Sequence, residues 1–163
     1  MIVLACEGNT EVYLMESLLR NGQIHFSDRL FTGHPLHCPQ ALRKYRQRLL
    51  RLPFDEKIVV YRIGDTLKDK LDVRGMELRD IQEIKLCTRP EIEVLILLRE
   101  GLYEAYAKTK SRIRPKTFLK EARPQIRVEE YFDKNDMVWA IMEYKRIARH
   151  RKGEGYIADL LAR

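Results

Sequence analysis

Two acidic residues directly follow apolar segments that are typical of buried β-strands. Glu7 comes after "MIVLAC" (1–6), and Asp65 comes after "KIVVYRIG" (57–64). Carboxylates are rarely buried without a partner or a metal. In a parallel sheet, ligands bind beyond the carboxyl ends of the strands, so two neighbouring strands would bring both carboxylates to one edge. Oxygen ligands of this kind suit Mg²⁺ or Mn²⁺, which assist reactions of phosphates.

The turn after Glu7 has the residues expected of an anion site. Gly8 has no Cβ and would let the backbone turn sharply and approach a ligand. Asn9 and Thr10 stand at the start of a helix predicted over 11–20, with Thr10 as a candidate N-cap. A helix N-terminus readily binds anions. A phosphate held there, beside a cation on the two strand-end acids, would suit a phosphodiester reaction.

The elements that must position these residues follow an α/β order. Apolar runs predict strands at 1–6, within 25–33, at 57–65 and at 81–87. Helical spacing predicts helices at 11–20, 39–52 and 91–108, and mostly helices from about residue 110 onward, with a short last helix after 153–155. We therefore expect an α/β fold with a mostly parallel sheet flanked by helices. No repeat or linker divides the chain, so we expect one domain, with a core at about 1–108 and a C-terminal helical extension at about 109–163.

The basic residues favour a polyanionic partner. The chain has 163 residues, a net charge of +7 and 45% hydrophobic residues, and its basic residues gather at 42–51, 108–127 and 145–152. Such clusters suit nucleic acid, DNA or RNA, although solvated helix faces are often basic as well. The residues expected to hold a nucleic-acid backbone are Arg43, Arg46, Lys110, Arg112 and Arg114, together with the turn of Gly8, Asn9 and Thr10.

Cysteine usage and hydropathy favour a cytoplasmic protein. Cys6, Cys38 and Cys87 are odd in number and widely spaced, as expected of reduced thiols, and Cys6 and Cys87 sit in apolar segments where a cysteine is normally buried. No run approaches the ~20 apolar residues that span a bilayer, so no membrane partner is expected. The first residues do not resemble a signal peptide.

Several common sites are not indicated. His34, His37 and Cys38 could suggest zinc, but no second pair of ligands with matching spacing occurs elsewhere in the chain. The sequence contains no P-loop, no G-x-G-x-x-G, no G-x-S-x-G and no H-E-x-x-H motif. Kinases, dehydrogenases and hydrolases of the usual types are therefore disfavoured.

Two motifs resemble a known family. "EGNTE" (7–11) after an apolar strand, followed about fifty residues later by "VVYRIGD" (59–65), resembles the Toprim domain of topoisomerases, DnaG-type primases and OLD-family nucleases. "IKLCTRPEIEVLILLREG" (84–101) resembles the RloB-like subgroup of small Toprim proteins. The resemblance covers about residues 1–105 and implies a Toprim-like, Rossmann-like sheet. It also implies a bacterial, archaeal or mobile-element setting, with antiviral defence as the expected role.

The resemblance assigns roles to individual residues. Glu7 would be the family's glutamate, acting in proton transfer or at the metal site, and Asp65 the first aspartate of a D-x-D pair. Leu67 stands where the second aspartate is expected. Asp69, four residues after Asp65, could reach the same site if a helical turn begins there. Glu93 is a further candidate, because related proteins carry a glutamate at this point.

Each of these acids also has an ordinary structural explanation. Glu11 fits a first-turn helix residue favoured by the helix macrodipole. Asp65, after a glycine, could cap the next turn. The exposed acids of "DTLKDKLD" (65–72), which include Asp69, would mostly be solvated.

Two functions remain as hypotheses. The first is a nuclease dependent on Mg²⁺ or Mn²⁺, with Glu7, Asp65 and Glu93 as catalytic residues and Glu7, Asp65 and Asp69 as metal ligands. The second is a nucleic-acid-binding or regulatory subunit without catalysis, partnered with a larger ATPase or another defence protein. The leucine in place of the second aspartate favours the second hypothesis.

Overall fold

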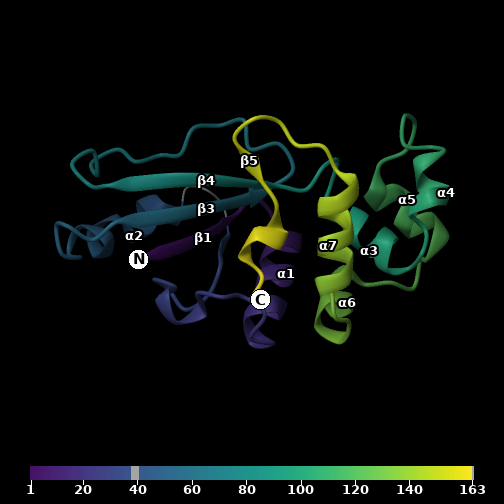
Figure 1. The fold of residues 1–163 in the computed structure, drawn as a ribbon, viewed down its shortest axis with the longest axis horizontal. Helices are drawn as coiled ribbons and strands as arrows, with labels where there is room; N and C mark the ends of the chain where they lie inside the picture. Colours follow the sequence, from purple (N-terminus) through teal and green to yellow (C-terminus); the bar gives the residue numbers. More distant parts are fainter. Residues whose placement is uncertain (38–40, 163) are drawn as a thin grey trace.

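The computed structural model describes residues 1–37 and 41–162, and its centre is a five-stranded parallel sheet (Figure 1). The strand order is β2-β1-β3-β4-β5, and every neighbouring pair is parallel. The strands are β1 (Ile2–Cys6), β2 (Leu36–His37), β3 (Ile58–Gly64), β4 (Ile81–Cys87) and β5 (Glu154–Gly155). The predicted α/β class with a parallel sheet flanked by helices is confirmed.

Helices cover both faces of the sheet. They are α1 (Asn9–Arg20), α2 (Ala41–Leu50), α3 (Val94–Arg99), α4 (Tyr103–Ala107), α5 (Pro115–Ala122), α6 (Val128–Lys134) and α7 (Val138–Ile147), with short 3₁₀ helices η1 (Ser27–Arg29) and η2 (Ile157–Leu160). Figure 1 shows α4 and α5 well beyond the carboxyl ends of the strands, on the side toward which the strand arrows point. Across the residues that the structure describes, no helix is both long and apolar enough to cross a bilayer.

The alternating residues of β1 enter two separate apolar cores. Ile2, Leu4 and Cys6 belong to the core that β1 shares with α1, α3, α6 and α7. Val3 and Ala5 belong to the core on the other face, which α2 and the loop after β3 complete. Because both faces are covered, β1 is apolar throughout and β3 is apolar except for the buried Arg62, as expected of central parallel strands.

The pairing of the strands decides where the site residues meet. β1 pairs with β3 from Ile2 opposite Val59 to Cys6 opposite Ile63, and Gly64 at the end of β3 lies opposite Cys87 of β4. The three central strands therefore end at one edge. The segments that follow them begin side by side, although they are far apart in the sequence.

Two predicted boundaries in the first half of the chain are wrong. The segment 25–33 contains η1 instead of a strand, and Leu30 makes only an isolated bridge to Ile2. Thr10 is not the N-cap of the first helix, because α1 begins at Asn9 and its N-cap is Gly8. Pro39, predicted near the start of the second helix, lies outside the described residues.

The second half differs from the prediction at two places. The helix predicted over 91–108 is interrupted between α3 and α4, where Gly101 has φ +69°, a conformation that few residues other than glycine adopt. The segment after residue 109 is not helical throughout. Glu154–Gly155 forms β5, which pairs with β4 and extends the sheet by one strand.

The described cysteines are buried free thiols. Cys6 and Cys87 are both fully covered, as predicted, and Cys38 lies outside the described residues. Burial raises the pKa of Cys6 well above its ordinary value and that of Cys87 to about 11. A thiol with a raised pKa is a poor nucleophile at neutral pH, so these two residues belong to the core.

Candidate active site

The carboxylate of Glu7 lies over the end of β3. The backbone N–H of Glu7 donates to the carbonyl of Ile63 (2.8 Å), which continues the β1–β3 ladder by one residue. The Glu7 carboxylate accepts a hydrogen bond from the backbone N–H of Asp65 (3.2 Å) and lies 3.4 Å from the Thr66 hydroxyl. The two strand-end acids are therefore neighbours in space.

Gly64 makes this approach possible. A Cβ added at Gly64 would lie 2.2 Å from Glu7 Oε2 and 2.8 Å from Glu7 Cβ, far inside van der Waals contact. Only glycine leaves room for the Glu7 side chain to cross the end of β3. The pair Gly64–Asp65 at the end of β3 therefore supplies both the space for the Glu7 side chain and the second acid.

Glu11 is a third acid near this edge, although its position in the sequence favours a first-turn helix residue over a catalytic group. It lies in the first turn of α1, as predicted, but its side chain is buried, with 8% exposed. Burial first, and then the charges of Glu93, Glu7 and Asp65, raise the pKa of Glu11 to about 7. These three acids are thus near enough to Glu11 for their charges to affect its pKa.

Gly8 serves this arrangement in a different way from the one predicted. Its φ of −136° and ψ of 172° are ordinary extended values, so no sharp turn requires glycine here. A Cβ at this position would instead lie 2.8 Å from Glu11 Oε2. Gly8 and Gly64 therefore each leave space for one carboxylate.

Glu93 closes the group from the opposite side. It is the N-cap residue of α3, with 5% of its surface exposed, and its carbonyl accepts the N–H groups of Ile96 and Leu97. Burial raises the pKa of Glu93, and the charges of Glu91 and Asp65 raise it further. We call Glu7, Glu11, Asp65 and Glu93 the acidic cluster.

Asp69 and Leu67 do not supply a further ligand. Residues 65–69 form no helical turn, which was the condition for Asp69 to reach the site. Asp69 is exposed, and its carbonyl accepts a 2.6 Å hydrogen bond from Arg62, whose side chain is buried in the sheet. Leu67, where the resemblance to Toprim domains predicts a second aspartate, is 3% exposed and has φ +38°.

One polar group beside the acidic cluster has no protein partner. The backbone N–H of Thr88, the residue after β4, donates to the carbonyl of Gly64 (3.0 Å). The hydroxyl of Thr88 is buried and makes no hydrogen bond to any described residue. Buried hydroxyls normally find a partner, so this oxygen is available to a ligand or water at the same edge.

The predicted basic residues fall into two separate groups. Arg43 and Arg46 are exposed on α2, which Figure 1 shows far from α4 and α5. Lys110 and Arg112 are exposed in the segment between α4 and α5, and Arg114 pairs with Glu91 (3.5 Å), two residues from Glu93. Within the second group, Arg114 is linked through Glu91 to the segment that carries Glu93.

The donor set fits a hard divalent cation by its chemistry. Within residues 1–37 and 41–162, no three or more His, Cys, Asp or Glu side chains are arranged to hold a metal ion. The acidic cluster offers only oxygen atoms, and Mg²⁺ commonly takes one or two carboxylates and completes its shell with water and phosphate. Burial is the main cause of the raised pKa of Glu11, and the charges of Glu93, Glu7 and Asp65 add to it; a cation at Glu7 and Asp65 would offset part of this second contribution.

Comparison with protein-family models gives no match, and comparisons with curated proteins and with solved structures give none either. The resemblance of "EGNTE" and "VVYRIGD" to Toprim domains therefore stays a prediction. The function has to be inferred from the geometry of this chain.

Proposed function

We propose that this protein is a Toprim-like nuclease that cleaves phosphodiester bonds of nucleic acid with Mg²⁺ or Mn²⁺ at the acidic cluster. The observation that carries the proposal is the hydrogen bond from the Asp65 N–H to the Glu7 carboxylate, which joins the acids of two neighbouring strand ends. Two further acids, Glu11 and Glu93, are buried, and the charge of Glu93 contributes to the raised pKa of Glu11. So many acids in one place destabilise a fold unless they have a use or a partner.

The proposed roles follow from position. Glu7 and Asp65 would hold the cation, which supplies charge stabilisation at a phosphate oxygen. Glu11, buried with a pKa of about 7, can accept and release a proton near neutral pH, as a general acid or base must. The backbone N–H groups in the first turn of α1, at Asn9 and Thr10, would bind a phosphate.

Nucleic acid would approach from the side of α4 and α5. Lys110 and Arg112 are exposed there, and Arg114 already pairs with Glu91 beside the acidic cluster. Phosphate contacts by such residues supply most of the non-specific affinity for nucleic acid. The resemblance adds a role in antiviral defence to the proposal, and the cysteine usage adds a cytoplasmic setting.

One observation favours a second candidate, a binding or regulatory subunit without catalysis. Leu67 occupies the position of the second aspartate and is packed in the interior, so no carboxylate can stand there. Such a subunit would bind nucleic acid and rely on a partner, for example a larger ATPase, for chemistry.

A cleavage assay separates the two candidates. Plasmid DNA and RNA are incubated with the protein and Mn²⁺ or Mg²⁺, beside Glu7→Gln, Asp65→Asn and the control Asp55→Asn. Asp55 is an exposed acid before β3, at the other end of the strand. The nuclease hypothesis predicts metal-dependent cleavage by the wild type and by Asp55→Asn, and none by Glu7→Gln or Asp65→Asn. Salt-sensitive binding without cleavage by any of the proteins would establish the binding subunit instead.

A further inference from the structure

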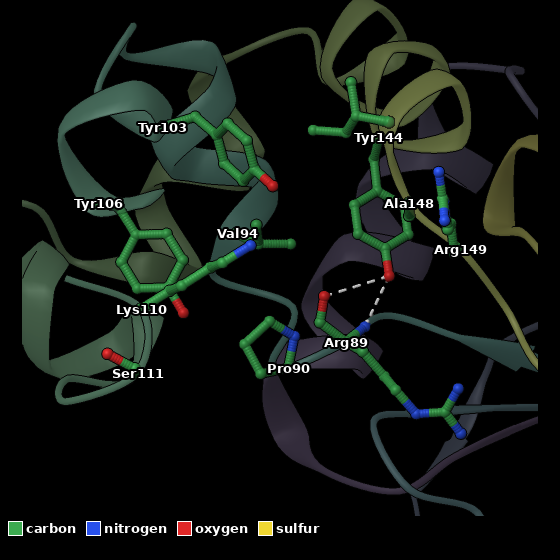
Figure 2. Close-up of a pocket in the computed structure, with 11 residues that line it drawn as sticks. Arg89, Pro90, Val94, Tyr103, Tyr106, Lys110, Ser111, Tyr144, Ala148 and Arg149 are labelled. Atoms are coloured by element: carbon green, nitrogen blue, oxygen red, sulfur yellow. Dashed lines mark hydrogen bonds between the residues drawn. The ribbon is translucent and has the colours of Figure 1, made fainter. Parts of the chain in front are cut away.

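A pocket of about 690 Å³ lies between the α3–α4 segment and α7 (Figure 2). This volume is within the range of about 300–1,000 Å³ that is usual for ligand sites. Its walls combine aromatic and basic residues, among them Tyr103, Tyr106, Tyr144, Lys110 and Arg149. Neither the sequence motifs nor the proposed cleavage reaction accounts for it.

The tyrosines form a fixed aromatic wall with one open ring. Tyr106 and Tyr144 are buried, at 2% and 3% exposure, and the Tyr144 hydroxyl accepts the backbone N–H of Arg89 (2.6 Å). Tyr103 is only partly covered and lies 6.3 Å from Tyr106, between ring centroids. Figure 2 shows the Tyr103 ring at the pocket, with its hydroxyl directed across toward α7. A planar ligand could therefore stack on Tyr103 against a rigid support.

The basic groups are placed for an anion at the mouth of this pocket. Figure 2 shows Lys110 reaching toward Val94 from one side, with Arg149 on the other. Both residues are exposed, and neither forms an ion pair or a side-chain hydrogen bond with another described residue. The guanidinium of Arg89 points away and pairs with Glu154, so it does not add to this charge.

The pocket and the acidic cluster share one segment of the chain, between β4 and α3. Pro90 and Val94 line it, and the residues between them include Glu91 and Glu93. The carboxylate of Glu91, in this segment, accepts the backbone N–H of Lys116 (3.1 Å) at the start of α5. A nucleic-acid strand bound at the acidic cluster could thus place its next nucleotide in the pocket.

We propose that this pocket receives one unpaired base of a nucleic-acid strand, stacked on Tyr103, with the adjoining phosphates on Lys110 and Arg149. A phosphate alone would make no use of the tyrosines, and a neutral apolar ligand would make no use of Lys110. A base with its phosphate uses both, and stacking on aromatic rings is how single strands are commonly bound. The inference rests on the proposed function and specifies its substrate as single-stranded, or with a base turned out of a duplex.

Binding without metal tests the inference separately from cleavage. Fluorescence anisotropy in EDTA compares a labelled single-stranded oligonucleotide, as DNA and as RNA, with an abasic strand of equal length and phosphate number. We expect the base-bearing strand to bind about 5- to 100-fold more tightly, the range for stacking of one base. Tyr103→Ala should bring the two affinities within about twofold, whereas Tyr103→Phe should preserve the difference.

Charge variants provide the matched control. Lys110→Gln should weaken both strands equally and reduce the salt dependence, because it removes a phosphate contact. Lys57→Gln removes the same charge before β3, at the far end of the strand, and should change neither affinity. If Tyr103→Ala proves unfolded by circular dichroism, Tyr103→Leu keeps most of the side-chain volume without the aromatic face.

The outcomes are distinct. Equal binding of base-bearing and abasic strands by the wild type would overturn the pocket assignment, even if Glu7-dependent cleavage is found. Preference for the base-bearing strand without metal-dependent cleavage would uphold the pocket and overturn the nuclease. A free 5′-mononucleotide that binds as tightly as the strand would overturn the assignment to a strand.

Discussion

Glu11 offers a quantitative test of the acidic cluster through the pH dependence of stability. Its carboxyl group is 8% exposed, and Glu93, Glu7 and Asp65 face it. Burial and these charges raise its pKa from 4.5 to about 7. Between these two pH values the folded protein holds a proton that the unfolded chain has released. The free energy of unfolding therefore falls as the pH rises through this window.

The expected size follows from the pKa. One pKa unit corresponds to about 1.4 kcal/mol, so a rise to about 7 makes the penalty at most about 3 kcal/mol once the pH exceeds 7. Glu11→Gln keeps the shape of the side chain and cannot ionise. Relative to wild type, the variant should gain stability between pH 4.5 and 7, reaching up to about 3 kcal/mol of relative gain at pH 8.

Urea denaturation followed by circular dichroism at pH 5, 6, 7 and 8, in EDTA, measures this difference. Glu121→Gln serves as the control, because Glu121 is exposed on α5 and should show no pH-dependent gain. The reasoning is refuted if wild type and Glu11→Gln change in parallel with pH. Such a result would mean that Glu11 ionises as freely in the fold as in the unfolded chain.

Three further substitutions have defined outcomes. Gly64→Ala would place a Cβ 2.2 Å from Glu7 Oε2. The affinity for Mn²⁺ should therefore fall at least about tenfold, and the free energy of unfolding should fall by about 1–3 kcal/mol. Mn²⁺ binding as tight as in wild type would contradict this geometry. Arg62→Met removes one partner of a buried ion pair and should cost about 2–4 kcal/mol in urea denaturation, and unchanged stability would show that the pair adds nothing. The Arg89 guanidinium lowers the pKa of Glu154 to about 2. Wild type should therefore exceed Glu154→Gln by about 1–2 kcal/mol above pH 4.5, with the advantage lost as the pH falls toward 2; a difference independent of pH would refute this.

The sequence predicted the edge that holds the acids because strand ends have a strong local signal. The apolar runs before Glu7 and Asp65 can be buried on both faces only as central strands of a sheet. Neighbouring parallel strands end at the same edge. The burial of Glu11 had no such signal, since an acid in the first turn of a helix is usually exposed and favoured by the helix dipole. Its place four residues after Glu7, at the end of "EGNTE", is the one clue that pointed to it.

Other features depend on contacts distant in the sequence and could not be predicted locally. β5 is two residues long and contains Gly155, so it has neither the length nor the composition of a strand, and only its pairing with β4 reveals it. Gly101 interrupts an apolar run that otherwise has helical spacing. The pocket needs Tyr103 and Tyr144 from helices some forty residues apart, and no local pattern predicts that they line one space.

A crystal soaked in millimolar Mn²⁺ tests the central claim most directly. Anomalous scattering identifies manganese and its ligands without reference to activity. The account predicts one Mn²⁺ bound by carboxylate oxygens of Glu7 and Asp65, and none there in crystals of Glu7→Gln. An anomalous map with no manganese between these two side chains, while the fold is intact, would contradict it.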